Sequence, residues 1–376
     1  MSKCIITIYI FLSFFCSYQF QNKNIVLYPL LFVQLIILGM NLFYLLKKKQ
    51  IKISNFVLSI ILITLFSSVF NYKTIGNYFI NIILIFNVYI LTKYRWNYIY
   101  KNLYYLAVIF NIINICIYIY SPRVYSAPKI IFGHELSKIQ LQEIGIAAMS
   151  KIALYSLFSE ILIKNKLLKI IIIIISLFTL LVGGKFTAIL AILVSLMIYV
   201  IIVKFSFFKS KLKYILKIML IISFLSSFIF YFFIEIFSKL FSVKNIFSGR
   251  SVLWLDYINY ILENKISILV GNGFFSEDKV ISYLSHPHNQ YLTILYTLGI
   301  FGFIIYYLLF SKNIDKILKV VKIYPDLLLL FIIQIIQMCG DDYYILTIEP
   351  IGMIFLFLIY NIKYSNKRAL IGEIDE

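Results

Sequence analysis

The chain has 376 residues, of which 62% are apolar and only 14% are charged. These fractions lie far from those of an average soluble domain, so they exclude a soluble enzyme, a disordered chain and a secreted disulfide scaffold. The roughly 233 apolar residues are close to the roughly 240 that twelve bilayer-spanning helices need, which indicates a polytopic, all-α membrane protein with a single membrane domain over residues 1–376.

The net charge of +19 does not indicate a nucleic-acid-binding protein, because the basic residues form short clusters between apolar runs. The four cysteines lie in or beside apolar runs without metal-ligand spacing, so neither a metal site nor a disulfide framework is expected. We expect no cofactor.

The apolar runs predict twelve spans, the first of which lacks a small-x-small cleavage site and is therefore interpreted as an uncleaved helix. The sixth is the least regular because it contains Glu143, Lys151 and Glu160. The predicted spans are 4–20, 25–46, 53–70, 77–92, 102–120, 141–161, 168–182, 186–203, 216–235, 290–310, 325–340 and 350–362.

The distribution of lysine and arginine predicts the orientation of these spans. With both termini in the cytoplasm, 23 of the 35 basic residues fall in the inside segments. The short outside turns at 21–24 and 71–76 carry one basic residue each. An error of one span would reverse every later loop, so this alternation favours twelve spans with both ends inside.

The first long outside segment, 121–140, follows span five and contains Arg123 at the predicted outer surface. A second outer-face cation is Lys185, in the almost chargeless turn Gly183-Gly184-Lys185 before span eight. A lysine, a helix N-terminus and exposed glycine amides together predict an anion-binding site. The alternative is a tight turn whose lysine extends to the membrane interface.

The largest outside segment is 236–289, between spans nine and ten, and it contains a predicted helix over 251–263. Arg250, Trp254 and Tyr257 recur at helical spacing and share one face of that helix. A guanidinium beside aromatic rings suits a sugar phosphate. The alternative is an amphipathic helix whose rings rest at the lipid headgroups, and the residue types do not decide between them.

The end of this segment combines a glycine turn with two histidines. Gly271-Asn272-Gly273 predicts a turn with positive φ, and Pro287 is expected to hold the following chain extended. Asn289 is a predicted N-cap for span ten, next to His288, which could act as a general acid or base. The alternative is a histidine that only caps or hydrogen-bonds. A zinc site from His286, His288, Glu277 and Asp278 lacks a recognised ligand spacing and is not favoured.

These motifs together resemble the O-antigen polymerase/ligase superfamily, and the Wzy-type polymerases in particular. The resemblance rests on Ser248-Gly249-Arg250-Ser251 with Trp254, Gly271-Asn272-Gly273-Phe274, His288-Asn289-Gln290-Tyr291-Leu292 and Gly299-Ile300-Phe301-Gly302. They occur in this order in a large outer loop before a late span. The family commonly has arginine in the turn before span eight, whereas this chain has Lys185, which keeps the charge but loses the bidentate fork.

The resemblance implies a GT-C-like membrane architecture and an inverting, metal-independent glycosyltransferase. Its donor would be an oligosaccharide linked to undecaprenyl diphosphate, with Arg250 at the diphosphate and His288 near the acceptor. Membrane lipid, a chain-length regulator protein and a flippase are the expected partners.

Two other functions fit parts of the sequence. An O-antigen ligase would transfer polysaccharide to lipid A core instead of to a second lipid-linked unit. A flippase or other transporter would instead place charged residues along mid-span cavities and leave the large outer loop unexplained.

Overall fold

The computed structural model describes residues 3–15, 24–48, 53–120, 129–131, 134–136, 146–182, 186–204, 208–229, 233, 250–263, 265–273, 287–340 and 351–362. Nearly all of these residues are helical, as the sequence predicts. The first half of the chain contains α1 (Lys3–Phe15), α2 (Asn24–Lys48), α3 (Asn55–Phe70), α4 (Ile75–Tyr94), α5 (Trp96–Tyr120), α6 (Ile146–Phe158) and α7 (Lys166–Val182). The second half contains α8 (Phe186–Lys204), α9 (Phe208–Phe224), α11 (Arg250–Glu263), α12 (Lys265–Val270), α13 (Gln290–Val320), α14 (Pro325–Gln337) and α15 (Ile351–Tyr360).

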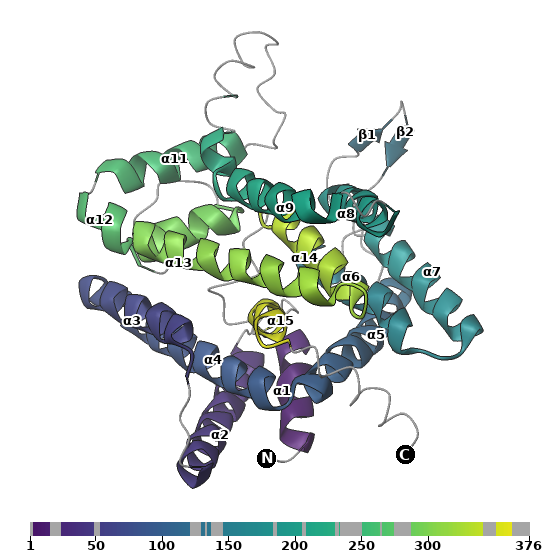
Figure 1. Cartoon of the computed structure of the whole chain (residues 1–376), viewed down its shortest axis with the longest axis horizontal. Coiled ribbons are helices and arrows are strands. Elements are labelled where there is room, and N and C mark those ends of the chain that lie inside the picture. The colour runs from purple at the N-terminus through teal and green to yellow at the C-terminus, as the bar shows by residue number, and fades with distance from the viewer. Residues whose placement is uncertain are drawn as a thin grey trace.

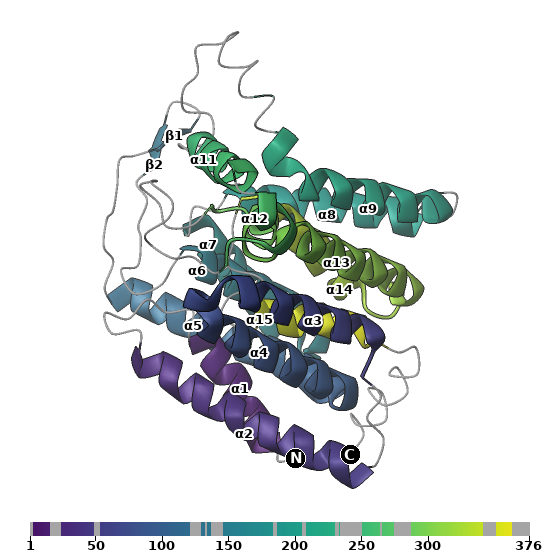
Figure 2. The same ribbon diagram turned by 90° about the vertical axis from the view of Figure 1, so that its left-hand side faces the viewer.

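Most of the long helices run roughly side by side and form a layered bundle (Figure 2). Helix α13 packs against α3, α9 and α15, and α14 packs against α8 (Figure 1). Every residue of α15 is buried, as are nearly all residues of α14. Because nearly all of their residues are covered by other parts of the protein, these two helices lie at the centre of the bundle.

Four described helices are long and apolar enough to cross a membrane: Tyr28–Lys47, Tyr72–Tyr94, Trp96–Cys116 and Gln290–Val320. Shorter apolar helices follow the other predicted spans, including Lys3–Phe15, Asn55–Phe70 and Pro325–Gln337. Each of the twelve predicted spans overlaps a described helix. The structure therefore supports a membrane protein, while the count of twelve and the GT-C architecture remain predictions.

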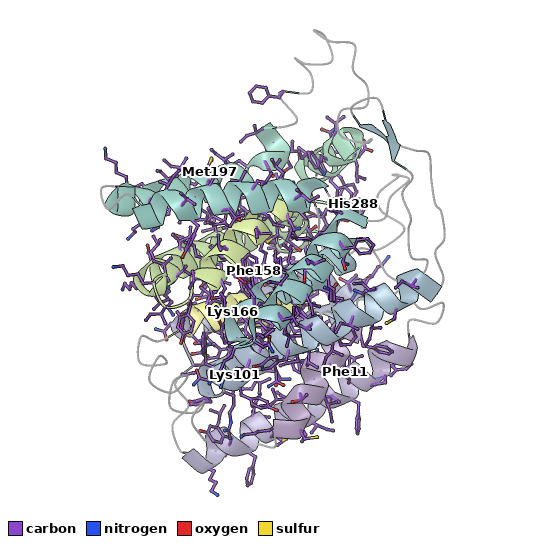
Figure 3. The ribbon with its side chains drawn as sticks, turned by 90° about the vertical axis from the view of Figure 1, so that its right-hand side faces the viewer. Phe11, Lys101, Phe158, Lys166, Met197 and His288 are labelled. Atoms are coloured by element: carbon purple, nitrogen blue, oxygen red, sulfur yellow. The ribbon has the colours of Figure 1, made fainter. Side chains whose placement is uncertain are left out.

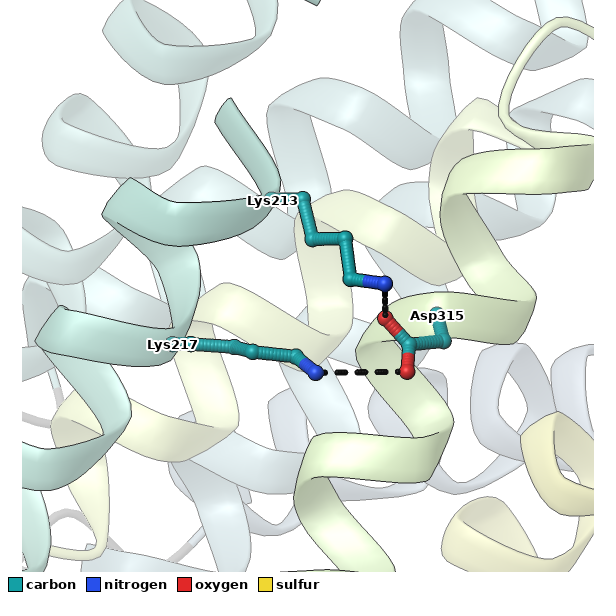
Figure 4. Close-up of polar contacts among 3 residues, drawn as sticks. All are labelled: Lys213, Lys217 and Asp315. Carbon is teal, nitrogen blue, oxygen red and sulfur yellow. Dashed lines mark hydrogen bonds and ion pairs between the residues drawn. The ribbon is translucent and has the colours of Figure 1, made fainter. Parts of the chain in front are cut away.

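The start of α3, the end of α13 and the end of α15 lie together at one end of the bundle, called the Asp315 end. The Ser54 and Tyr360 hydroxyls are 2.6 Å apart, and the Lys316 ammonium lies 3.9 Å from the Tyr360 ring centroid. Asp315 of α13 pairs with Lys213 and Lys217 of α9 at 3.0 and 3.3 Å (Figure 4). The basic residues of α9 and α13 thus lie at one end, as the sequence predicts for an inside face.

The opposite end, called the His288 end, brings together the ends of α3, α12 and α14 and the start of α13. The Asn71 amide donates to the Gly271 carbonyl oxygen at 3.2 Å, and the Asn289 amide donates to the Cys339 carbonyl oxygen at 3.1 Å. Figure 3 labels His288 toward this end and Lys101 and Lys166 toward the other.

The start of α1 and the end of α15 both lie at the Asp315 end. The Tyr98 hydroxyl donates to the Lys3 carbonyl oxygen at 3.0 Å, and Asn361 donates to the Thr92 hydroxyl at 2.8 Å. The first described helix therefore begins, and the last described helix ends, on one side of the described bundle.

Buried polar side chains connect helices that are distant in sequence. The Asn41 amide donates to the Asn87 side chain at 3.1 Å, which joins α2 to α4. The Tyr100 hydroxyl donates to the Asp326 carboxylate at 2.8 Å, and Tyr104 donates to the same oxygen. In an apolar bundle such hydrogen bonds between helices help to fix which helices pack together.

Two details depart from an all-α chain with regular spans. Within the first long outside segment, β1 (Lys129–Ile131) and β2 (His134–Leu136) form a two-stranded antiparallel hairpin. The irregular sixth span corresponds to α6, which ends at Phe158, and its Lys151 is only 2% exposed.

Candidate functional site

Asn289 caps α13, as the sequence predicts. Its side-chain oxygen accepts from the backbone N–H groups of Tyr291 and Leu292 at 3.0 and 3.1 Å. The Gln290 N–H donates to the Met338 carbonyl oxygen at 2.9 Å. These N–H groups therefore already have protein acceptors, so the start of α13 could act on a bound anion only through the helix dipole.

The segment from Pro287 to Gln290 is held by three neighbouring parts of the chain. The Asn289 amide donates to the Ser226 hydroxyl at 3.2 Å and to the Cys339 carbonyl oxygen at 3.1 Å, so it contacts both the segment after α9 and the end of α14. On the other side, the Trp254 indole N–H of α11 donates to the Pro287 carbonyl oxygen at 2.7 Å.

His288 has a left-handed backbone, with φ of 48°, whereas the other described non-glycine residues have negative φ. The prediction that Pro287 keeps this stretch extended is therefore wrong at His288. A left-handed backbone costs a non-glycine residue on the order of 1–2 kcal/mol, and it persists only where the surroundings hold it. The residue is partly exposed, between buried Pro287 and buried Asn289.

Helix α11 confirms the predicted helix but orients its aromatic side chains inward. Trp254 is 3% exposed and Tyr257 is 1% exposed, and both pack with Leu292 and Tyr296 of α13 in one apolar cluster. The Tyr257 and Tyr296 rings meet edge to face at 5.1 Å. The helix face that carries Trp254 and Tyr257 packs against α13. This burial matches neither rings that rest at the lipid headgroups nor rings that are exposed to bind a sugar.

The two glycine motifs of the sequence meet where α12 crosses α13. Gly271 and Gly273 have φ of 83° and 90°, which confirms the predicted turn. Gly299 interrupts α13 with φ of 66° and ψ of −168°, a conformation that essentially only glycine adopts. A Cβ on Gly271 would lie 2.2 Å from the Thr297 oxygen, so the backbones touch because side chains are absent.

The interruption at Gly299 frees backbone carbonyl oxygens that the rest of the site uses. The Tyr296 oxygen accepts from the Asn272 N–H at 2.6 Å, and the Thr297 oxygen accepts from the Tyr78 hydroxyl at 2.9 Å. The Ser67 hydroxyl donates to the Val270 carbonyl oxygen. Helix α4 and the turn after α12 are thus fastened to α13 at Tyr296 and Thr297, and α3 is fastened to α12.

Several predicted site residues lie outside the described part of the structure. Gly183, Gly184 and Lys185 fall between the end of α7 and the start of α8, and Arg123 follows α5. Arg250 is the first residue of α11, but its side chain is not described. The proposed anion site therefore stays a prediction, and so does any contact between Arg250 and a phosphate.

The other two histidines and several acidic residues of the outer segments also lack described side chains. His134 lies in β2 without a described side chain, and His286, Glu277, Asp278, Asp341 and Asp342 lie outside the described residues. Within the described part of the chain, no three His, Cys, Asp or Glu residues group closely enough to hold a metal ion.

On α11, partial burial and then the Glu263 carboxylate raise the pKa of Tyr260 above its ordinary value. Its phenol therefore stays protonated at neutral pH. The Tyr260 ring packs at a tilt on Tyr296, with the centroids 6.0 Å apart.

Comparison with known families places this site in context. Residues 171–307 match the family model described as O-antigen ligase, which is fewer than half of the residues in the chain. The match begins within α7 and includes Lys185, Arg250, Trp254, Tyr257, His288 and Asn289. This partial match supports membership of the O-antigen polymerase/ligase superfamily. No curated protein in the comparison matches the chain.

Members of this family are glycosyltransferase-like enzymes, so the match supports a polymerase- or ligase-type function without distinguishing the two. Arg123 lies outside the matched region. The match supports the resemblance to the superfamily that the sequence motifs indicate, and it does not single out the Wzy-type polymerases.

Sequence reasoning missed the residues that hold the His288 segment. Ser226, Met338 and Cys339 contribute through a hydroxyl or backbone carbonyls, which leave no motif in the sequence. Gly299 was visible as part of a motif, but its contact with α12 was not predicted.

Proposed function

We propose that the chain polymerises oligosaccharide repeat units linked to undecaprenyl diphosphate into O-antigen or a related surface polysaccharide, acting as an inverting glycosyltransferase at the outer face of the bacterial cytoplasmic membrane. The observation that carries the proposal is the superfamily match, which covers the structurally held His288 segment. Both termini would then be cytoplasmic, with the Asp315 end inside and the His288 end outside.

The proposed reaction is a single displacement at the anomeric carbon of the donor sugar. His288 takes the proton from the acceptor hydroxyl, whose oxygen forms the new glycosidic bond as the bond to the diphosphate breaks. Negative charge builds on the departing diphosphate, and preorganised cations lower the barrier by stabilising that charge.

Arg250, Lys185 and Arg123 are the cations proposed to bind the diphosphate, with the Gly183 and Gly184 amides beside Lys185. Asn289 contributes by fixing the start of α13. Tyr257 packs α11 against α13 and supports the site from behind.

The lipid carrier explains why this chemistry would occur in a membrane bundle. The polyprenyl tail would stay among the membrane lipids while the diphosphate and sugars reach the His288 end. A flippase would deliver the donor to the outer face, and a chain-length regulator protein would limit the product. No nucleic acid or metal takes part in this proposal.

The second candidate is O-antigen ligation to lipid A core, and the family model's own description favours it. The donor chemistry is shared, so the acceptor separates the two functions. In a deletion strain, loss of a polymerase leaves surface lipid capped by one repeat unit. Loss of a ligase instead leaves bare core and polymer that remains on its carrier.

The test is the glycolipid banding pattern of a deletion strain with and without the gene restored. We expect single-unit bands in the deletion strain and a full ladder after restoration. Restoration with Arg250→Ala, Lys185→Ala or His288→Ala should leave single-unit bands at normal protein level.

Lys322→Ala, at an exposed lysine of the Asp315 end, is the matched control and should restore the ladder. A wild-type ladder from all three site variants would refute the site assignment, and bare core in the deletion strain would identify a ligase.

A further inference from the structure

A buried side chain of α11 donates a hydrogen bond to the peptide unit between Pro287 and His288. The Pro287 carbonyl oxygen accepts from the Trp254 indole N–H at 2.7 Å, and this contact is buried. Because a peptide unit is planar, fixing the direction of this carbonyl also fixes the direction of the His288 N–H.

The other side of His288 is fixed independently of Trp254. Asn289 donates to Ser226 and to the Cys339 carbonyl oxygen, and the Gln290 N–H donates to the Met338 carbonyl oxygen. His288 therefore lies between an anchored peptide unit and an anchored residue, Asn289. Its φ of 48° is the conformation that joins them.

Trp254 is built into the protein rather than presented at a surface. Only 3% of the residue is exposed, and it packs with Leu253 and Ile258 of its own helix and with Leu292 of α13. A ring this enclosed has no face for stacking on a sugar, whereas its N–H reaches the backbone next to the proposed base.

We infer that Trp254 is a positioning residue that holds the Pro287–His288 peptide unit and so aims the His288 imidazole at the acceptor. This inference rests on the proposed function for the role of His288, but the geometric coupling between the two residues does not. It replaces the expectation that Trp254 contacts the donor sugar.

The kinetic test compares Trp254→Phe, which keeps an aromatic ring but loses the N–H donor, with Ile258→Ala. The control residue is buried on the same helix and in the same apolar cluster, and it has no polar side-chain atom. Each variant would be purified in lipid nanodiscs and assayed with lipid-linked oligosaccharide extracted from the deletion strain of the host.

We expect Trp254→Phe to lower kcat by about 10- to 100-fold at an unchanged KM, because a misaimed base slows the chemical step. Ile258→Ala should keep kcat within about threefold of wild type, since it removes packing without freeing the Pro287 carbonyl. A raised KM at unchanged kcat would indicate sugar binding and overturn the inference, as would a wild-type kcat.

A second test requires no activity and uses thermal unfolding midpoints of Trp254→Phe, His288→Gly and the double variant. Glycine at position 288 adopts a positive φ without strain, so the effect of His288→Gly on the midpoint should include a gain from relieved strain where Trp254 holds the peptide unit. In Trp254→Phe the segment can relax, and the gain should shrink. Ile258→Ala combined with His288→Gly should be additive.

The two tests separate the inference from the proposed function. Additive midpoints for Trp254→Phe and His288→Gly would overturn the inference whatever the activity. Non-additive midpoints with a wild-type chain that transfers no sugar would refute the proposed function and leave the coupling between Trp254 and His288 supported.

Discussion

Gly299→Ala should destabilise the protein by forcing α12 away from α13. The added Cβ would lie 2.3 Å from the Leu269 carbonyl oxygen and 2.6 Å from the Val270 nitrogen. Both are backbone atoms, so no side chain can rotate to make room, and the helices must separate.

The expected magnitude follows from two contributions. Holding alanine in a conformation that favours glycine costs about 1–3 kcal/mol. Separation also breaks the bond from the Asn272 N–H to the Tyr296 oxygen, which contributes about 0.5–1.5 kcal/mol. We therefore expect a loss of about 3 kcal/mol, together with loss of polymer, because the first turns of α13 carry the His288 segment.

Thermal unfolding of the purified protein in nanodiscs, followed by the fluorescence of its two tryptophans, measures this change. Gly39→Ala is the matched control, because an added Cβ there meets nothing within 4 Å and the residue lies inside α2. Alanine is the better helix former, so this control should be neutral or stabilising by up to about 1 kcal/mol. Equal unfolding midpoints for the two variants would refute the crossing geometry.

Three further substitutions test the other anchors. Asn289→Ala should cost about 2–3 kcal/mol in thermal unfolding, because α13 loses its cap and the segment loses two donated bonds. A midpoint equal to that of the wild type would contradict the capping role. Asp326→Ala should cost about 3 kcal/mol by leaving two buried phenols without an acceptor. Asp326→Asn keeps an acceptor oxygen, so equal unfolding midpoints for the two variants would contradict this. Asp315→Asn should cost less than about 1 kcal/mol, and the loss should vanish at high salt, because the pairs with Lys213 and Lys217 are partly exposed. A large loss that salt does not change would contradict this description of the ion pairs.

The helices at the predicted spans could be predicted because a long apolar run by itself indicates a helix that is removed from water. Asn289 and the glycine turn were predicted correctly for a similar reason, since a cap and a positive φ are decided by residues that are neighbours in the chain. Both features are local.

The remaining features depend on contacts between distant segments. Each of three contacts joins positions far apart in sequence. These are the backbone contact where α12 crosses α13 at Gly271 and Gly299, the bond from Trp254 to Pro287, and the bonds from two phenols to Asp326. A single sequence shows only that Trp254 and Tyr257 share a helix face, and that face could equally contact lipid, a sugar or another helix. The structure assigns it to α13.

The His288 segment illustrates the same limit within the site. Proline predicted an extended chain, but the bonds from Trp254 on one side and Asn289 on the other hold His288 in a left-handed conformation. The histidine was identified from its sequence neighbours, whereas the groups that position it lie on three other parts of the chain.

The sidedness of the His288 end is the claim on which the proposed chemistry depends most. Single cysteines would be introduced at Glu263 of α11 and at Lys322 beyond α13, both exposed positions, in a chain without its four native cysteines. A membrane-impermeant thiol reagent should then label position 263 in intact cells, or in spheroplasts if an outer membrane is present, and position 322 only after lysis. Labelling of position 322 in the sealed cells, with position 263 protected until lysis, would contradict the account.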